Sequence, residues 1–143
     1  MNEQFITDLK SRVSSNLHYV DIDMVRVCLA IIDHVAIGPS KKPHLTFYDL
    51  IRVSPKVNED VFYDAVFYLT KKNINVLEQQ FEAINPRTHS FQHIVDKKTF
   101  IEDMRDGELY NPFVGDLLSE KEFGEQVITY FSPSQYFMEK VNG

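Results

Sequence analysis

The sequence predicts a mainly α fold with a small β-hairpin, which belongs to the α+β class. Apolar residues recur at the spacing of one helical face through most of the 143 residues. The pattern changes to that of strands over 76–84 and 88–95, with an Asn-Pro-Arg turn at 85–87 between them. A composition of 43% hydrophobic and 25% charged residues is typical of globular proteins. The length suits one domain, so we expect a single domain over 1–143.

Two helices are predicted in the first part of the chain. Residues 3–15 carry apolar side chains on one face and charged side chains on the other, which predicts an amphipathic helix. The segment from 21 to 37 is apolar nearly all round, which is typical of a central core helix. Asp21 or Asp23 can cap its first turn, and the Gly-Pro pair at 38–39 ends it.

Two further helices flank a short turn. Thr46 and Asp49 form a variant of the capping box and begin a short helix. Pro55 disfavours helical geometry in the residue before it, so this helix ends shortly before the proline. Asn58 caps the next helix, which we expect over 58–72. The connection has the length of a helix-turn-helix turn.

The remainder of the chain is predicted to be helical with one irregular stretch. Residues 96–105 have an apolar stripe at helical spacing, whereas 107–118 contain Gly and Pro and no regular pattern. A capping box that begins at Ser119 opens a helix that we expect to run to about Phe131. A Ser-Pro pair then breaks the chain, and 134–141 form a last short helix.

Residues 21–98 therefore hold, in order, a core helix, a short helix, a turn, a longer helix and a hairpin. The segments are VRVCLAIIDHVAIG, LTFYDLIRVSP, NEDVFYDAVFYLTKKN and INVLEQQFEAINPRTHSFQHIV. This order resembles the winged helix-turn-helix superfamily. The resemblance implies that the 58–72 helix occupies the recognition position. It also implies that the helix at 3–15 and residues 99–143 are extensions of a winged-helix core, which in such proteins often serve dimerisation.

The outward face of the 58–72 helix predicts what it binds. At about 100° per residue, one side is apolar and faces the core: Val61, Phe62, Ala65, Val66 and Leu69. The opposite side carries Asp60, Tyr63, Asp64, Phe67 and Lys71. Two carboxylates and two aromatic rings with one lysine favour a protein interface. We predict a non-enzymatic, intracellular protein that acts through protein–protein contacts, with a protein partner or by self-association as a homodimer.

A DNA-binding transcriptional regulator is the alternative function. Residues 41–98 hold nine basic and seven acidic side chains, a net charge of +2, whereas the rest of the chain carries −8. Such a protein would contact duplex DNA through the 58–72 helix and the hairpin. The basic side chains available for phosphate contacts are Lys41, Lys42, Lys56, Lys71, Lys72 and Arg87. Ordinary solvated loop charges explain the same residues equally well.

No pattern in the chain predicts an enzyme, a cofactor or a small-molecule ligand. Phosphate-binding glycine motifs, nucleophile motifs and zinc-helix motifs are absent from the sequence. Cys28 is the only cysteine and lies among aliphatic residues, so we expect a buried thiol. His89 and His93 share a face of the predicted strand, but a third ligand is lacking and we predict no metal site. The chain lacks a signal-peptide pattern and a long apolar run, so we expect a cytoplasmic protein with no membrane contact.

The segment 102–125 is strongly acidic. It holds eight acidic side chains against Arg105 and Lys121. Apolar residues are interleaved with these acids: Leu109, Tyr110, Phe113, Val114, Leu117 and Leu118. Such a surface can dock on a basic protein or mimic the charge of a nucleic acid. We favour the simpler interpretation, in which the apolar residues pack inward and the acids face water.

Overall fold

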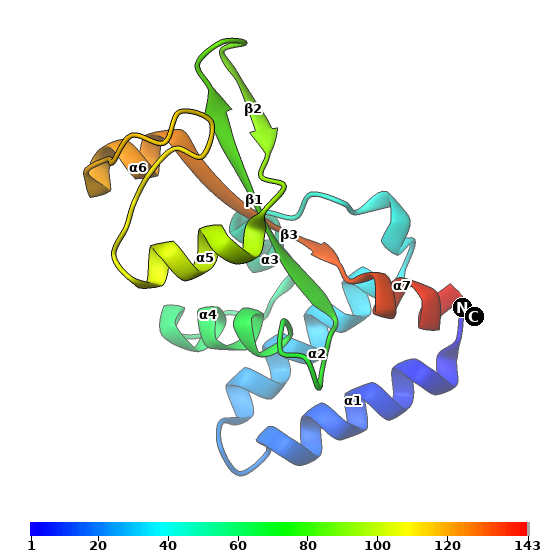
Figure 1. Ribbon diagram of the computed structural model, residues 1–143. Coiled ribbons are helices and arrows are strands. Elements are labelled where there is room, and N and C mark those ends of the chain that lie inside the picture. Colours follow the sequence, from blue (N-terminus) through cyan, green and yellow to red (C-terminus); the bar gives the residue numbers. More distant parts are fainter. Residues whose placement is uncertain (143) are drawn as a thin grey trace. The chain divides into compact units, whose positions relative to one another are not determined.

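The computed structural model describes residues 1–142 and confirms the α+β class (Figure 1). Within these residues there are seven α-helices, one short 3-10 helix and three strands. In chain order they are α1 (Glu3–Leu17), α2 (Ile22–Ala36), η1 (Pro39–Lys41), α3 (Phe47–Val53), α4 (Glu59–Tyr68), β1 (Leu77–Asn85), β2 (Ser90–His93), α5 (Lys97–Arg105), α6 (Glu120–Gln126), β3 (Val127–Pro133) and α7 (Gln135–Asn142).

The chain divides into two compact units. The first unit comprises Met1–Glu78 with Phe131–Gly143, and the second unit comprises Gln79–Tyr130. The chain leaves the first unit within β1 and returns to it within β3. The predicted winged-helix segment, 21–98, therefore takes residues from both units.

The core of the first unit is built around α2. Seven residues of α2 are buried, as expected for a helix that is apolar nearly all round. One face of α1 adds buried residues at helical spacing: Ile6, Leu9, Val13 and Leu17. Cys28 is fully buried and its thiol donates a hydrogen bond to the carbonyl of Ala65 in α4, at 3.7 Å. This burial confirms the expected buried thiol, and it raises the pKa of Cys28 to about 12.

The helix starts follow the capping residues that the sequence predicts. Thr46 and Asp49 form the reciprocal capping box at α3, and the side chain of Asn58 accepts a hydrogen bond at the start of α4. Asp21 caps α2 in the same way. The end of α4 differs from the prediction, because the helix stops at Tyr68 and not near residue 72.

The chain turns after α4 so that two apolar residues enter the core. Ile74 and Val76 are buried, and between them Asn75 has a positive φ of 55°. The Ser134 hydroxyl donates to the carbonyl of Asn75 at 2.7 Å, and its backbone N–H donates to Val76. A residue in this left-handed conformation interrupts an α-helix, and asparagine adopts the conformation more readily than most residues.

The predicted hairpin is present, with a longer turn. The sheet order is β2-β1-β3, and β1 pairs antiparallel with β2 from Glu82 opposite His93 to Asn85 opposite Ser90. Residues 86–89 form the turn, so β2 is shorter than the strand predicted over 88–95.

The helix predicted over 119–131 is wrong in its second half. The capping box of Ser119 with Glu122 begins α6 as expected, but the helix ends at Gln126 and β3 follows. Residues 127–131 are β-branched or aromatic, a composition that favours a strand. Thr129 joins β3 to β1, because its hydroxyl donates to the carbonyl of Gln80 and accepts from the Gln79 amide, both at 3.0 Å.

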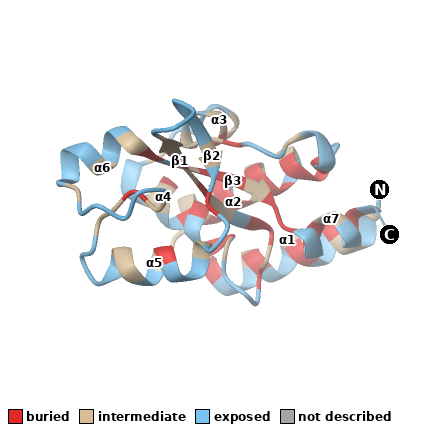
Figure 2. Ribbon diagram, turned by 45° about the horizontal axis from the view of Figure 1, so that its top comes forward, coloured by how far each residue is buried: buried red, intermediate tan, exposed pale blue. Residues whose placement is uncertain are grey.

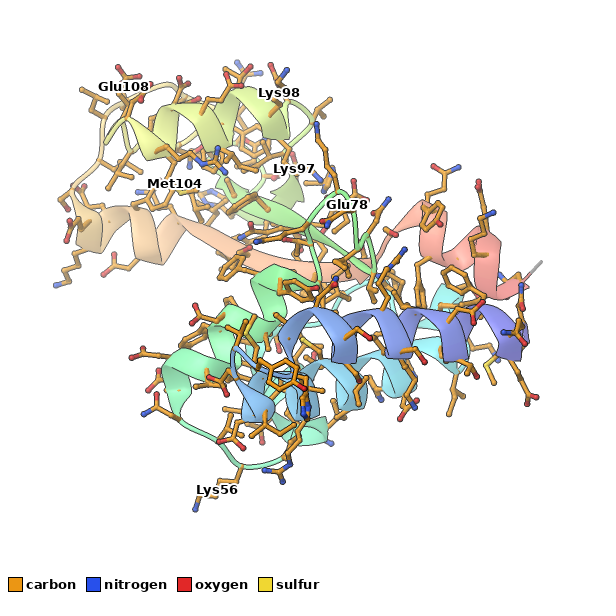
Figure 3. The ribbon with its side chains drawn as sticks, turned by 90° about the horizontal axis from the view of Figure 1, so that it is seen from below. Lys56, Glu78, Lys97, Lys98, Met104 and Glu108 are labelled. Atoms are coloured by element: carbon orange, nitrogen blue, oxygen red, sulfur yellow. The ribbon has the colours of Figure 1, made fainter. Side chains whose placement is uncertain are left out.

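The second unit has a small core centred on Phe100 of α5. Its ring lies 5.5 Å from that of Phe81, 5.6 Å from Tyr110 and 5.9 Å from Phe123. Met104 of α5 packs against the same cluster and lies between α5 and α6 in Figure 3. Figure 2 shows the tip of the hairpin and most of α6 as exposed.

No helix within residues 1–142 is long and apolar enough to cross a membrane.

Candidate protein-interaction site

The predicted contact residues of α4 and its following turn are mostly exposed. Asp60, Asp64 and Lys71 are exposed, and Phe67 is 42% exposed. Tyr63 is only half-buried and lies under another ring. The inward-facing set predicted for this helix is buried, except that Val61 is intermediate. The assignment of the two faces of α4 is therefore correct in outline.

A ring of α3 covers part of the aromatic side of α4. The Phe47 ring centroid lies 5.1 Å from that of Tyr63 and 6.2 Å from that of Phe67, both in edge-to-face geometry. Phe131 of β3 lies 5.2 Å from Phe47 and is fully buried. Phe47 and Phe131 could not be predicted from the faces of α4, because neither residue belongs to that helix.

A groove of about 260 Å³ lies between α3 and α4, at the turn that joins them. Its lining is mostly apolar: Ile51, Ser54, Pro55, Lys56, Val57, Glu59, Phe62 and Tyr63. Phe62 is buried at the base, whereas Ile51 is 49% exposed. Tyr48 of α3 is also largely exposed, at 69%. An apolar groove next to exposed aliphatic and aromatic side chains is typical of a protein-binding surface.

The turn that forms one wall of the groove is locally determined. Pro55 ends α3, and the Ser54 hydroxyl donates to the carbonyl of Leu50 at 2.7 Å. In Figure 3 the Lys56 side chain extends from this turn away from the helices around it. Lys56 was among the residues expected to make contacts, whereas Ile51 and Val57 were not. Helical periodicity places Ile51 on the outer face of α3, but it has no bearing on Val57, which lies in the turn.

The charges around the groove are of both signs. Lys56 and Glu59 both line it, and further exposed charges lie on α3 and α4 at Arg52, Asp60 and Asp64, with Lys71 beyond the end of α4. The Tyr63 hydroxyl donates to the Glu59 carboxylate, which raises the pKa of Tyr63. The Arg52 guanidinium lies over the Tyr48 ring at 5.7 Å. Cations and anions are therefore interleaved with exposed apolar side chains.

The residues predicted for DNA contact lie on four separate segments. Lys41 and Lys42 are in the loop after α2, Lys56 precedes α4, and Lys71 and Lys72 follow it. Arg87 is in the hairpin turn, which belongs to the second unit.

One of these lysines has an internal partner. The Lys42 ammonium donates a hydrogen bond to the carbonyl of His34, and burial lowers the pKa of Lys42. Burial also lowers the pKa of His34, with the charge of Lys42 as the next cause. Lys42 is therefore less available for a phosphate than an exposed lysine.

The expected strand face with two histidines is not present. His89 lies in the hairpin turn with a positive φ of 57°, so it is not part of β2. His93 ends β2, and its Nδ1 lies 3.2 Å from the Tyr130 hydroxyl. Across residues 1–142, no group of three or more His, Cys, Asp or Glu side chains is placed to hold a metal ion.

Comparisons of the chain with known protein families, with curated proteins and with solved structures found no match.

Proposed function

We propose that this protein acts by binding protein through the groove between α3 and α4, and that the molecule bound there is a second copy of the chain. The observation that carries the proposal is the groove itself, which combines an apolar base with exposed Ile51 and with Lys56 and Glu59 at its edge. In a two-fold dimer the same patch meets itself. Lys56 of each copy then faces Glu59 of the other, while Ile51 lies near the symmetry axis.

The size of a stable interface requires more than the groove. A specific interface covers about 800 Å² on each partner. The flanking exposed rings, Tyr48 and Phe67, extend the apolar surface on the two helices. We therefore assign these rings to the interface as well. Tyr63 supports the groove from within, since its ring meets that of Phe47 edge-to-face and its hydroxyl donates to Glu59.

The element order supports the winged-helix resemblance that places α4 in the recognition position. Helices α2, α3 and α4 precede the antiparallel pair β1 and β2. Leu45, between α2 and α3, exchanges two backbone hydrogen bonds of 2.7 Å with Phe131. The sheet position beside Leu45 is thus taken by β3, and not by the second strand of the hairpin.

DNA binding has less support at this surface. A duplex is bound largely by neutralising its phosphates. The exposed start of α4 instead presents Glu59 and Asp60, with Asp64 one turn later. These carboxylates would repel a phosphate backbone, whereas they can pair with Arg52, Lys56 or Lys71 of a second copy.

The proposal is tested by sedimentation equilibrium over a range of protein concentrations. We expect the wild type to associate to a dimer, and Ile51→Asp to shift it to monomer because a charge would be buried at the centre of the interface. Val20→Asp is the matched control, since Val20 is 73% exposed and lies outside α3 and α4. It should leave the association constant unchanged.

A charge exchange tests the pairing itself. Lys56→Glu and Glu59→Lys should each weaken association by about tenfold, because like charges then meet across the axis. The double variant restores opposite charges and should recover most of the loss. A wild type that stays monomeric at every concentration would refute self-association. Binding to duplex DNA that weakens steeply with salt would favour the alternative function.

A further inference from the structure

The second unit contains a cavity that is independent of the groove in the first unit. It has a volume of about 330 Å³. Its lining is mainly apolar: His93, Ile94, Val95, Asp96, Thr99, Phe100, Tyr110, Pro112 and Phe113. Ile94 and Phe100 are buried at its base, whereas Val95 is 93% exposed and Phe113 is 38% exposed. The cavity thus has a closed apolar floor and an open apolar rim.

The apolar residues of the acidic segment do not all pack inward. Val114 is 49% exposed and Leu117 is 76% exposed, close in sequence to the cavity wall at Pro112 and Phe113. The simpler interpretation of the acidic segment, with its apolar residues packed inward, is wrong for these side chains. Solvent-exposed apolar side chains beside an apolar cavity leave a surface that a partner can cover.

The wall that carries Phe113 is held in place by a buried asparagine. The Asn111 amide donates to the carbonyl of Ile84 at 2.8 Å and to the Gln126 side chain at 2.9 Å. Its side-chain oxygen accepts from the backbone N–H of Phe113 at 2.9 Å. A wall that is ordered before binding reduces the entropy that a ligand must overcome.

Two carboxylates lie in the cavity lining or bonded to it. Asp96 lines it, and the Tyr110 hydroxyl donates to Asp103 at 2.6 Å. The hydrogen bond to Asp103, and then burial, raise the pKa of Tyr110 to about 12, and the charges of Asp103, Glu108 and Asp96 add to this rise. In Figure 3 Lys98 is near the start of α5 and Glu108 lies beyond its other end. Across the second unit, ten acidic side chains outnumber five basic ones, a net charge of −5.

We propose that this cavity binds a lysine- or arginine-rich segment of a partner protein, which places an aliphatic side chain on the floor formed by Ile94 and Phe100. The basic residues of that segment then pair with Asp96 in the cavity lining and with Glu108, whose charge acts on the lining residue Tyr110. An acidic rim disfavours a nucleic acid or an anionic membrane, because both carry the same sign of charge. The complementary ligand is a basic segment with an apolar anchor.

The test uses fluorescence anisotropy with a labelled synthetic peptide made of alternating lysine and leucine pairs. We expect the full-length protein to bind this peptide. It should bind two control peptides far more weakly: one has alanine in place of leucine, and the other has glutamate in place of lysine. Phe113→Ala should weaken binding by about tenfold, since it removes an anchor contact. Val95→Ser should also weaken binding, and Val95 is too exposed for this change to affect folding.

A matched pair of charge variants separates specific from general attraction. Asp96→Asn with Glu108→Gln should weaken binding by about fivefold at low salt and reduce its salt dependence. Glu120→Gln with Glu125→Gln makes the same change in net charge at exposed positions of α6 and should have little effect. An equal loss in both pairs, equal binding of the alanine peptide, or no binding by the wild type would overturn the proposal. Preferential binding of anionic vesicles or duplex DNA would overturn it as well.

Discussion

The two units of this chain differ in how they are stabilised. The hydrophobic cluster of the first unit has 24 buried residues, whereas that of the second unit, in 52 residues, has five. Their net charges are −1 and −5, respectively. A small core supplies less hydrophobic stabilisation, so polar contacts contribute a larger share in the second unit. The comparison predicts a rigid first unit and a second unit that opens more readily.

The largest expected effect is in the core of the first unit. Phe131→Ala removes a fully buried ring that packs against Phe47 and Phe67. We expect a loss of about 3–5 kcal/mol in the free energy of unfolding, measured by urea denaturation followed by circular dichroism. Phe91→Ala is the control, because Phe91 is 40% exposed, and its cost should stay below about 1 kcal/mol. Equal losses would contradict the burial pattern.

An intermediate effect is expected from the polar anchor of the second unit. Asn111→Ala removes the three hydrogen bonds of a fully buried side chain and leaves the part-buried carbonyl of Ile84 without this donor. We expect a cost of about 2–3 kcal/mol. Native-state hydrogen exchange should show this loss of stability as faster amide exchange in residues 79–130, while the exchange rates in α2 change little. Asn73→Ala, at an exposed position, serves as the control.

A uniform increase in exchange through both units would contradict this difference in stability. It would mean that the chain unfolds as one cooperative body. The two units would then differ in the size of their cores but would unfold together as a single folding unit.

The smallest effect is expected at alkaline pH, where each unit has a group whose pKa is raised to about 12. The pKa of Cys28 rises from 9.0 to about 12, and that of Tyr110 rises from 10.0 to about 12. Folding therefore favours their protonated forms. The stability contributed by Cys28 is complete below pH 9, that of Tyr110 is complete below pH 10, and both are lost as pH rises through about 12. As the pH rises, the free energy of unfolding should fall less steeply in Cys28→Ala and in Tyr110→Phe than in the wild type.

The control for the alkaline experiment is thiol reactivity. Below pH 9 the buried Cys28 of the native protein should react with a thiol reagent only through opening of the structure. Rapid modification at neutral pH would contradict both the burial and the raised pKa of Cys28.

The sequence was sufficient for the features that depend on near neighbours. A capping side chain and the backbone N–H that it accepts from lie within a few residues, so Thr46, Asn58 and Ser119 could be identified directly. The outward residues of α4 followed from helical geometry alone. The groove could not be predicted in the same way, because its base is Phe62 of one helix and its rim is Ile51 of another.

The strand β3 shows the same limit and a missed signal. Its residues are β-branched and aromatic, which favours a strand, but a capping box lay just before them and the helix was extended too far. What makes 127–133 a strand is pairing with β1, more than forty residues earlier in the chain. No periodicity within the segment encodes that partner.

The sequence by itself determined the α+β class, the helix starts, the central position of α2 and the two faces of α4. These depend on interactions between residues close together in the chain. Only the tertiary structure decided that Phe47 covers Tyr63, that Phe113 stays partly exposed beside a cavity, and that β3 completes the sheet. Each of these depends on contacts between distant segments, whose free energy is realised only when the chain folds and the solvent is excluded.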